Sequence, residues 1–452
     1  MARLVIVSNR VPAPRRGAKP EAGGLAVALT DALGRGEVLW FGWSGEIGSA
    51  TAERPREIVR GRTRWVTVDL SAEDYALYYA GFANATLWPL FHYRLGLVSF
   101  QREQLEGYLR VNERFARALA PLLRPDDRIW IHDYHLIPLG RALRRLGVGN
   151  PAGFFLHVPF PPPAVVAALP RGELLFGAFQ AYDLVGVQTA TDAAHLEAVL
   201  AAIGVRVPVA PFPVGIDPAT VARLAIRAQG EQQVAGIART LGSRLLVLGV
   251  DRLDYSKGLP HRFEGYARLL RRAPDLRKRV TFLQLAPVGR AEVAEYRALK
   301  RELDELAGRI NGEFGDIDWV PLRWVNRAVP RAVVAGLCRL ARVGLVTPLR
   351  DGMNLFAKEF VAAQDPEDPG VLVLSCFAGA AFELEGAVLV NPHDPQEIAE
   401  ALASALAMPL EERKARHARD RAAVELRCAR SWAQGFLAAL EAAAAARFAA
   451  AA

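Results

Sequence analysis

Charged and amide side chains gather in an otherwise apolar segment, TPLRDGMNLFAKEFVAA, at residues 347–363. The run VGLVTP predicts a strand, LRDG a turn, and MNLFAKEFVAAQ the helix that follows. The first backbone N–H groups of such a helix, at Met353, Asn354 and Leu355, have no partner within the helix and are suited to bind a phosphate. A polar ligand at the start of this helix explains the cluster better than a buried or a plain surface helix.

Two carboxylates flank the same helix start. Asp351 precedes the helix, whereas Glu359 lies two turns into it, too far along for the same phosphate. A carboxylate accepts hydrogen bonds from both hydroxyls of a diol, so both residues suit sugar hydroxyls. The alternative is an acid at a helix N-terminus plus a charged surface pair, which requires no ligand.

A second segment, VDRLDYSKGLPHRF at residues 250–263, repeats this arrangement after another predicted strand. Arg252 and Lys257 lie around a turn, Gly258 permits tight backbone, and Leu259 with the following proline predicts the start of a helix. Two cations at such a turn can neutralise a diphosphate leaving group as its charge develops. A solvated basic loop is the alternative.

Other motifs narrow the chemistry. Gly23 and Gly24 in AGGLAVAL allow close approach of a ligand to the backbone, but there is no GxGxxG dinucleotide fingerprint. The absence of GxxxxGK[ST] and GxSxG argues against P-loop phosphoryl transfer and an α/β-hydrolase. HDYH at 132–135 and DID at 316–318 lack a recognisable third ligand, so no metal is expected.

Short apolar runs alternate with longer amphipathic stretches along the whole chain, which predicts β-α units around parallel sheets. Ligands of open α/β sheets bind beyond the carboxyl ends of the strands. The polar residues that follow the apolar runs are Ser8-Asn9-Arg10, His132-Asp133, His157, Asp251-Arg252 and Arg350-Asp351. Both halves of the chain therefore predict polar side chains at one edge of a sheet, as a cleft between two domains would require.

The composition excludes several classes. The 452 residues suffice for two α/β domains, and the three cysteines are scattered without CxxC spacing, which favours a reducing compartment. The N-terminus lacks the pattern of a signal peptide, and no run reaches the roughly 18 apolar residues of a membrane span, so a cytoplasmic protein with no membrane association is expected. The net charge of +8 suits a phosphorylated substrate. Nucleic-acid binding is the alternative, but no recognition signature supports it.

A family resemblance rests on segments that run in order through the chain: VSNR, AGGLAV, WFGWSGE, LWPLFHYR, VNERFA, IWIHDYHL, GFFLHVPFP, DLVGVQT, RLDYSKGLP, GRINGEFG, TPLRDGMNLFAKEFVAAQ and VNP. Together they closely resemble glycosyltransferase family 20. The resemblance implies an α/β chain with a GT-B fold, in which two Rossmann-like doubly wound domains face a central cleft. The expected parts are an acceptor-binding domain at 1–225, a nucleotide-sugar-binding domain at 226–430, and a C-terminal helix at 431–452 that packs back toward the first domain.

The resemblance also implies an activity. Members transfer glucose from UDP-glucose to glucose 6-phosphate with retention, on the front face, to give alpha,alpha-trehalose 6-phosphate, with no cofactor and no obligatory metal. The partners expected are thus these two small molecules, while a homo-oligomer is left open. Nothing after residue 400 suggests a phosphatase domain, so a separate phosphatase is expected to act downstream.

The resemblance assigns roles by position. The acceptor-binding residues it implies are Arg10, Tyr79, Trp88, Asp133 and Arg290. The donor-binding residues it implies are Gly23, Gly24, Arg252, Lys257, Val329, Asp351, Gly352, Met353, Asn354, Leu355 and Glu359. Arg252, Lys257, Asp351 and His157 form the implied catalytic set, with His157 beside the transferred glucose. Without the resemblance, Trp88 would be read as a core aromatic.

One position departs from the family. Val329 stands where the family often has an aromatic residue near the uracil, so ADP-glucose or GDP-glucose is an alternative donor, and glycerol 3-phosphate is an alternative acceptor. A catalytically silent regulatory relative is a further alternative, against which the retained charged positions argue.

Overall fold

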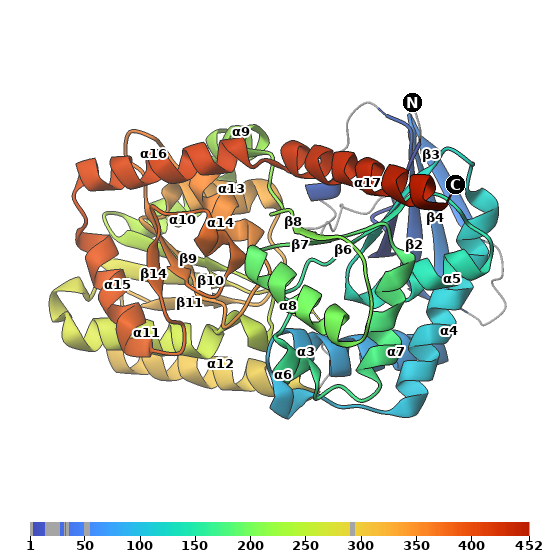
Figure 1. Cartoon of the computed structure of the whole chain (residues 1–452). Coiled ribbons are helices and arrows are strands. Elements are labelled where there is room, and N and C mark those ends of the chain that lie inside the picture. The colour runs from blue at the N-terminus through green and yellow to red at the C-terminus, as the bar shows by residue number, and fades with distance from the viewer. Residues whose placement is uncertain are drawn as a thin grey trace. The chain divides into compact units, whose positions relative to one another are not determined.

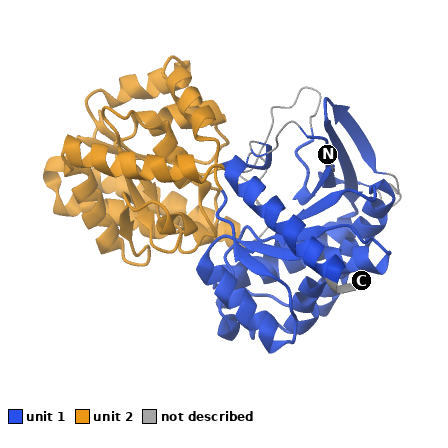
Figure 2. Ribbon diagram, turned by 45° about the horizontal axis from the view of Figure 1, so that its top comes forward, with its two compact units in different colours: residues 1–214, 429–452 blue, residues 215–428 orange. Residues whose placement is uncertain are grey.

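The computed structural model describes residues 3–13, 28–30, 32, 36–48, 55–289 and 294–451. The contacts between residues divide the chain into two compact units, which are coloured separately in Figure 2. Unit 1 comprises Met1–Val214 and Ala429–Ala452, and unit 2 comprises Gly215–Cys428. The chain thus returns to the first unit after it has completed the second.

The described part of unit 1 contains an eight-stranded sheet in the order β3-β4-β2-β1-β5-β6-β7-β8. Its strands are β1 (Leu4–Arg10), β2 (Val38–Ile47), β3 (Arg56–Arg60), β4 (Thr63–Leu70), β5 (Arg128–His132), β6 (Ala152–Phe155), β7 (Leu184–Val187) and β8 (Val209–Pro211). All neighbouring strands pair in parallel except β3, which is antiparallel to β4. The central strands are apolar on both faces because helices cover both faces of a parallel sheet.

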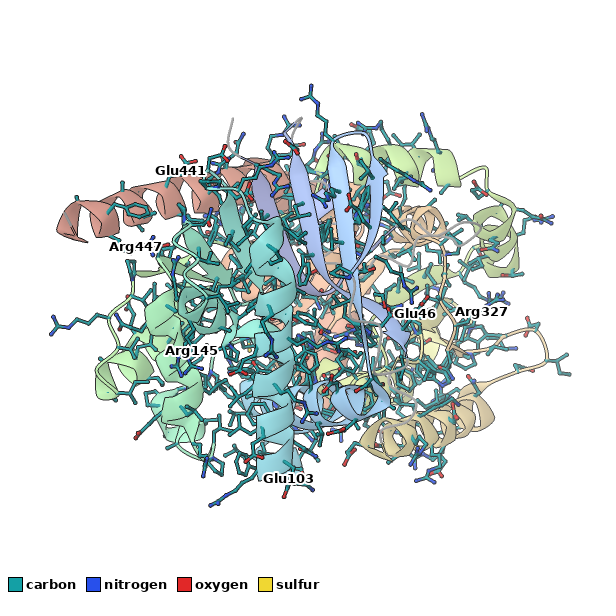
Figure 3. All side chains as sticks on the ribbon, turned by 90° about the vertical axis from the view of Figure 1, so that its right-hand side faces the viewer. Glu46, Glu103, Arg145, Arg327, Glu441 and Arg447 are labelled. Carbon is teal, nitrogen blue, oxygen red and sulfur yellow. The ribbon has the colours of Figure 1, made fainter. Side chains whose placement is uncertain are left out.

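Most helices of unit 1 lie between these strands in sequence, and one follows unit 2. They are α2 (Ala72–Asp74), α3 (Trp88–Phe91), α4 (Arg102–Leu119), α5 (Leu139–Arg145), α6 (Pro163–Val166), α7 (Gly172–Phe176), α8 (Ala190–Ala202) and α17 (Ala429–Ala451). Four short 3-10 turns join them: η2 (Leu95–Leu97), η3 (Ala120–Leu122), η4 (Tyr134–Leu136) and η5 (Gly177–Ala181). Between α2 and α3 lies a π-helix, η1 (Tyr75–Leu87). Side chains on the surface include Glu103 near the start of α4 and Arg145 at the end of α5 (Figure 3).

Unit 2 contains a six-stranded parallel sheet in the order β11-β10-β9-β12-β13-β14. Its strands are β9 (Leu245–Val250), β10 (Val280–Leu285), β11 (Leu322–Val325), β12 (Val343–Val346), β13 (Val371–Ser375) and β14 (Val388–Val390). From β9, the first strand, β10 and β11 follow on one side and β12, β13 and β14 on the other. This is the order 3-2-1-4-5-6 of a Rossmann fold. The predicted class, α/β with two doubly wound parallel sheets, is confirmed.

Helices lie on both sides of this second sheet (Figure 1). They are α9 (Pro218–Ala228), α10 (Gln232–Leu241), α11 (Leu259–Arg272), α12 (Ala294–Phe314), α13 (Arg331–Leu340), α14 (Leu355–Ala363), α15 (Pro395–Ala407) and α16 (Leu410–Leu426), with short turns η6 (Tyr255–Lys257), η7 (Pro274–Leu276) and η8 (Gly379–Phe382). The expected boundary at residue 225 would cut α9, whereas α9 packs against α13 and α14 within unit 2.

The helix α17 packs against β6 and β7 of unit 1. Its Phe436 is fully buried, and its ring stacks on Trp130 of β5 at 4.8 Å between centroids. Two strand glycines make room for this ring, because a Cβ atom at Gly153 or Gly186 would lie 2.7 Å or 2.8 Å from its atoms. Nearer its end, Arg447 bonds to the buried Asp183, and Glu441 pairs with Arg128; both helix residues are labelled in Figure 3.

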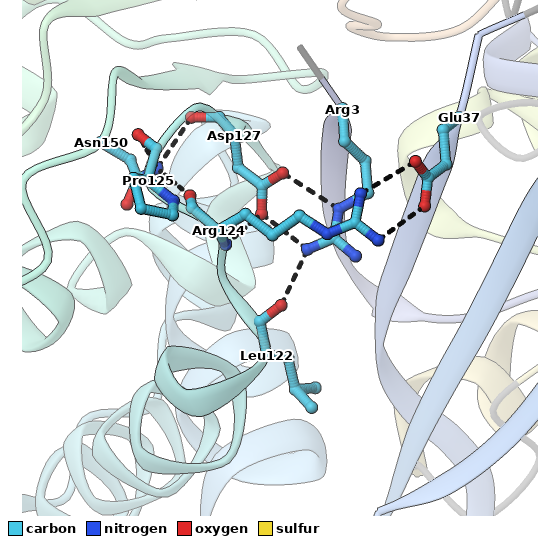
Figure 4. A network of polar contacts seen from close by, with 7 residues as sticks. All are labelled: Arg3, Glu37, Leu122, Arg124, Pro125, Asp127 and Asn150. Atoms are coloured by element: carbon cyan, nitrogen blue, oxygen red, sulfur yellow. Dashed lines mark hydrogen bonds and ion pairs between the residues drawn. The ribbon is translucent and has the colours of Figure 1, made fainter.

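Ion pairs and hydrogen bonds connect the residues that precede three strands of unit 1, at the amino-terminal end of its sheet (Figure 4). Arg3 donates from Nε and Nη2 to the two carboxylate oxygens of Asp127, at 3.0 and 2.6 Å, and both side chains are buried. Arg124 donates its backbone N–H to Asp127 and pairs with Glu37 at 2.9 Å. This network joins the amino-terminal ends of β1, β2 and β5. Among the described residues, no helix is both long and apolar enough to cross a membrane.

Candidate active site

The strand order of each sheet reverses at one point, and polar residues gather there. In unit 1 the order reverses between β1 and β5, and in unit 2 between β9 and β12. Ligands of doubly wound sheets bind beyond the carboxyl ends of the strands at this switch point. Arg10 ends β1 and Asp133 follows β5, while Arg252 follows β9 and Asp351 follows β12. These four predicted site residues thus end or follow the strands that flank the switch point of their sheet.

Arg10 is exposed at the end of β1, and its guanidinium lies over Gly45 of β2. A Cβ atom at Gly45 would lie 2.6 Å from Arg10 Nε, so this glycine makes room for the arginine. One residue earlier, Asn9 Oδ1 accepts a hydrogen bond of 2.7 Å from Tyr78 Oη. The end of β1 is thereby joined to the π-helix η1.

Tyr79 lies in the π-helix η1 and packs in a cluster of aromatic side chains. Its ring stacks on His135 at 5.8 Å between centroids with an interplanar angle of 12°, and it also contacts Trp43 and Tyr75. The ring is partly buried. π-helical turns are rare and occur frequently at functional sites, and the sequence contained no sign of this one.

Asp133 follows β5 in a strained backbone conformation, with φ of 76° and ψ of 163°. A residue with a side chain seldom occupies this region, and such strain is concentrated at active sites. The turn is held by hydrogen bonds from the Asp133 N–H to the Phe155 carbonyl at 2.8 Å and from the Leu136 N–H to the Asp133 carbonyl at 3.0 Å. Asp133 Oδ1 accepts a bond of 3.2 Å from the backbone N–H of His157. Two predicted site residues are thus in direct contact.

His157 is partly buried, and its Nε2 lies 3.0 Å from Nδ1 of His132, the last residue of β5. Burial lowers the pKa of His157 to about 3. Burial, and then the neighbouring His157, hold the pKa of His132 well below its usual value. Both imidazoles are therefore neutral near pH 7. His132 and His157 were both predictable as polar residues at strand ends, but their contact was not, because nothing in one sequence shows that β5 and β6 are neighbours.

Trp88 lies at the start of α3 with 5% of its surface exposed. Its ring contacts His92 at 4.0 Å and Tyr134 at 5.8 Å between centroids. These contacts are those of a core aromatic residue.

In unit 2, Lys257 and Asp351 form an ion pair of 2.5 Å between Nζ and Oδ2, although 94 positions separate them. Asn354 Nδ2 donates to the same carboxylate oxygen at 3.0 Å. All three side chains are largely or partly buried. Donor residues that the sequence placed on two separate loops are therefore in contact.

Gly258 makes this contact possible. It adopts φ of +65°, and a Cβ atom there would lie 2.4 Å from the Thr347 carbonyl oxygen. Only glycine allows that turn to lie so close to the end of β12. The predicted helix start at Leu259 is confirmed.

The helix after Asp351 begins later than predicted. It starts at Leu355, because Asn354 adopts a left-handed conformation with φ of 71° and caps the helix, its Oδ1 accepting the Ala357 N–H at 3.1 Å. Met353 and Asn354 therefore precede the helix. The unbonded N–H groups of its first turn begin at Leu355. Gly352 lies between Asp351 and Met353 and is buried.

Glu359 lies in α14 and pairs with Arg331, the first residue of α13, at 3.4 Å. Val329 lies two residues before that arginine. Nothing in the sequence indicates a role for Arg331, since its spacing from Glu359 matches no motif. Its contact with Glu359 makes it a further candidate for the predicted donor-binding set.

A fully buried arginine, Arg262, holds the segments that carry Lys257 and Asp351 through hydrogen bonds. It donates to Asp251 at 2.5 Å, to Gln284 at 2.8 Å and to Thr347 Oγ1 at 3.0 Å, and more weakly to the Lys257 carbonyl at 3.4 Å. Burial raises the pKa of Asp251 despite this partner. In the sequence, this buried ion pair could be recognised only by an arginine on the apolar face of a predicted helix.

Three predicted residues, Gly23, Gly24 and Arg290, lie outside the described residues. Within the described residues, no group of three or more histidine, cysteine or acidic side chains is arranged to hold a metal ion. Asp316 of the DID segment forms an ion pair with Lys278. Arg252 follows β9 and is partly buried.

Comparison with known proteins gives one consistent result. The family model described as glycosyltransferase family 20 matches residues 2–442. The trehalose-6-phosphate synthase of Sinorhizobium fredii is 49% identical over 432 residues, which are 92% of this chain and 93% of the relative.

Two solved structures are similar over nearly the whole chain. The UDP-forming alpha,alpha-trehalose-phosphate synthase of Burkholderia xenovorans in complex with glucose-6-phosphate matches with a TM-score of 0.94 and 45% identity, over 98% of this chain and 100% of that one. The E. coli structure bound with UDP-2-fluoro glucose matches with a TM-score of 0.92 and 44% identity, over 97% of this chain and 99% of that one.

Proposed function

Because the chain belongs to glycosyltransferase family 20, we propose that it has the activity of a UDP-forming alpha,alpha-trehalose-phosphate synthase. It is a hexosyltransferase with a GT-B fold, which moves glucose from UDP-glucose to glucose 6-phosphate and makes alpha,alpha-trehalose 6-phosphate. The observation that carries the proposal most directly is the contact between Lys257 and Asp351 at the β9/β12 switch point. It puts a cation suited to a diphosphate beside a carboxylate suited to a sugar hydroxyl.

The donor half of the proposal uses unit 2. Lys257 and Arg252 bind the diphosphate, and the first N–H groups of α14 add backbone donors. Asp351 accepts hydrogen bonds from hydroxyls of the glucosyl group, and Glu359 accepts them from the ribose. The relative bound with UDP-2-fluoro glucose supports this class of donor.

The acceptor half uses unit 1. Arg10 binds the phosphate of glucose 6-phosphate, since a guanidinium matches phosphate geometry. Tyr79 adds its hydroxyl and Asp133 binds a hexose hydroxyl, with Arg290 as a second phosphate ligand. The relative in complex with glucose-6-phosphate supports this acceptor.

The chemistry we propose retains the anomeric configuration. The acceptor hydroxyl attacks C1 on the face from which the diphosphate leaves, so the C1–O bond to phosphate breaks as the new C1–O bond forms on the same side. The proton of the acceptor hydroxyl moves to the leaving phosphate oxygen, and UDP departs. Arg252 and Lys257 stabilise the growing negative charge, so no carboxylate nucleophile and no metal ion is required.

Two further statements belong to this proposal. The protein acts in the cytoplasm, and a separate phosphatase removes the phosphate from its product. Fractionation of cells that express the tagged chain, and release of free phosphate from the product by a lysate but not by the purified chain, test these statements.

One assay tests the activity and its alternatives. The purified chain is incubated with UDP-, ADP- or GDP-glucose and with glucose 6-phosphate or glycerol 3-phosphate, and the products are identified by NMR. We expect UDP and an alpha,alpha-linked disaccharide phosphate, with unchanged rate in the presence of a chelator. ADP-glucose or GDP-glucose as the better donor would assign the alternative specificity to the Val329 position, and no product from any pair would overturn the proposal.

A further inference from the structure

We propose that His132 is a positioning residue for the transfer reaction, which fixes the tautomer and orientation of His157 so that His157 Nδ1 carries a proton and acts as a hydrogen-bond donor. The inference rests on the proposed function in one respect, namely that His157 lies beside the transferred glucose. The rest follows from the geometry of the pair.

The two imidazoles are held together at the carboxyl ends of neighbouring strands. His132 ends β5 and is fully buried, and His157 follows the end of β6. Their rings lie 5.3 Å apart between centroids at 29°, and His132 Nδ1 is 3.0 Å from His157 Nε2. A hydrogen bond between these two nitrogens requires that one carries the proton and the other accepts it.

Aromatic rings enclose the pair. Trp130 lies 4.6 Å from the His132 ring and Phe155 lies 4.6 Å from the His157 ring, between centroids. Trp432 of α17 contacts both imidazoles, at 6.3 and 5.9 Å. This apolar surrounding disfavours an imidazolium, so both rings stay neutral and each carries one proton.

The remaining nitrogen of His132 indicates which of the two carries the shared proton. His132 Nε2 is buried and has no hydrogen-bond partner among the residues that the structure describes. A buried N–H without a partner is rarer in proteins than an acceptor without one. The favoured tautomer therefore leaves a lone pair on Nε2 and places the proton on Nδ1, which donates to His157 Nε2.

The tautomer of His157 follows. Since its Nε2 accepts a hydrogen bond, its own proton lies on Nδ1. This nitrogen forms no hydrogen bond with the described part of the chain, and it is not among the buried polar atoms without a partner, so solvent or a ligand can reach it. The backbone of His157 is also fixed, by its N–H bond to Asp133 and by a bond of 3.4 Å from Gln188 to its carbonyl. His157 thus presents an N–H donor to an oxygen of the transferred sugar.

Two substitutions in the full-length chain test this role. In His132→Asn the side-chain amide lies close to the position of the imidazole Nδ1 and still donates, whereas His132→Phe fills the space without a donor. We expect kcat to fall about tenfold in His132→Phe with a smaller change in KM for glucose 6-phosphate, and to stay within about threefold in His132→Asn. His195→Phe, which removes a hydrogen bond to the Phe160 carbonyl elsewhere in unit 1, is the matched control and should keep its kcat.

A second measurement does not depend on activity. Nitrogen-15 NMR of the histidine-labelled wild-type chain near pH 7.5 reports which nitrogen of each ring is protonated. We expect protonated Nδ1 on both His132 and His157, and a mixture of tautomers for His157 in His132→Phe. Protonated Nε2 on His157 in the wild type overturns the inference, as does unchanged kcat in a folded His132→Phe. If His132→Phe does not fold, the wild-type spectrum still decides the matter.

The two proposals can fail separately. A wild-type chain that makes no disaccharide phosphate refutes the proposed function, while the tautomer of His157 can still be measured. A chain that makes this product at the same rate with and without the His132 donor refutes only the inference.

Discussion

At the scale of single residues, the ion pair of Lys257 and Asp351 joins a cation and a carboxylate to which the proposed function assigns two parts of one substrate. The pair is partly buried, with 11% and 15% of the two side chains exposed, so its charges are less screened than those of a surface pair. In the function we propose, a diphosphate competes with Asp351 for the ammonium group, while hydroxyls of the sugar satisfy the carboxylate. Exchange of partners avoids leaving either charge buried alone, which would be costly.

The substitution Lys257→Ala tests the role of the cation. If Lys257 stabilises the charge that develops on the leaving diphosphate, kcat should fall by about 100- to 1,000-fold, more than the KM for glucose 6-phosphate rises. Lys300→Ala, which breaks an exposed lysine–aspartate pair on α12, is the control and should leave kcat unchanged. Steady-state kinetics with both substrates varied decides between these outcomes, and an undiminished kcat in Lys257→Ala would rule out the role.

The low pKa of His157 leads to a prediction about pH. Because burial lowers this pKa to about 3, the ring is neutral at every pH above that value, and its NMR signals should not titrate between pH 5 and 8. The folded-state pKa lies below the ordinary value of about 6.5, so its neutral form favours folding, and that contribution is lost as the pH falls from about 6.5 toward 3. A titration midpoint between 6 and 7 would show that the surroundings of the ring do not lower its pKa.

The strand-end residues were predictable from sequence, because an apolar run followed by a polar residue marks the carboxyl end of a buried strand. Arg10, Asp133, Arg252 and Asp351 all follow such runs. Their partners were not predictable in the same way. His132 meets His157 only because β5 and β6 are adjacent in the sheet, which local pattern does not reveal.

At the scale of elements, Arg262 joins helix α11 to three strands. It lies in the first turn of α11 and bonds to Asp251 after β9, to Gln284 of β10 and to Thr347 after β12. These strands are neighbours in the sheet of unit 2. The guanidinium thereby holds the loops that carry Lys257 and Asp351 at a fixed separation.

Replacing this arginine should destabilise unit 2. Arg262→Met leaves the buried Asp251 carboxylate without its cation, and breaking a buried pair in this way typically costs about 3–5 kcal/mol. Arg268→Met on the same helix removes an arginine that is 41% exposed and pairs with Glu264, so it should cost less than about 1 kcal/mol. Urea unfolding followed by circular dichroism measures both, and equal stabilities of the two variants would contradict the structural role of Arg262.

A buried acid in α16, Asp420, should make the protein less stable as the pH rises, whereas His157 should make it less stable as the pH falls. Burial raises the pKa of Asp420 to about 6, so its neutral form favours folding below the ordinary value near 4, and this contribution is lost as the pH rises through about 6. Asp420→Asn is neutral at every pH, and its side-chain oxygen can still accept the Gly386 N–H that Asp420 Oδ1 accepts at 2.6 Å. We expect the variant to be more stable than the wild type by about 1–3 kcal/mol at pH 7.5 and equally stable near pH 4.

The control for that measurement is Glu411→Gln, an exposed carboxyl in the same helix, whose stability should match the wild type at each pH. Urea unfolding at pH 4, 5, 6 and 7.5 supplies the data. A constant difference between Asp420→Asn and the wild type would show that Asp420 does not titrate in this range.

The sequence predicted which segments are strands and helices better than it predicted the kind of helix or the residue at which a helix starts. The α/β class followed from alternating apolar runs and amphipathic stretches, and both parallel sheets are present. The π-helix η1 was not predictable, because its residues carry no pattern that separates i,i+5 from i,i+4 hydrogen bonding. The late start of α14 depends on the left-handed conformation of Asn354, which only the neighbouring turn decides.

At the scale of the whole molecule, unit 1 is built from the two ends of the chain. Residues 429–452 belong to it although they follow all of unit 2 in sequence. Trp432 and Phe436 of α17 are buried against Trp130 and Phe155 of the first segment. The core of unit 1 is therefore incomplete without the last helix.

Two phenylalanines of the same helix test how much α17 contributes. Phe436 is fully buried and fills the space above Gly153 and Gly186, so Phe436→Ala leaves a cavity there and should reduce the stability of unit 1 by about 3–5 kcal/mol. Phe448 is 51% exposed and lies under Arg447, so Phe448→Ala should change stability by less than about 1 kcal/mol. Urea unfolding followed by tryptophan fluorescence reports mainly on unit 1, which contains six of the eight tryptophans. If Phe436→Ala unfolded at the same urea concentration as Phe448→Ala, the packing of α17 would contribute little, and the N-terminal segment would have to be stable by itself.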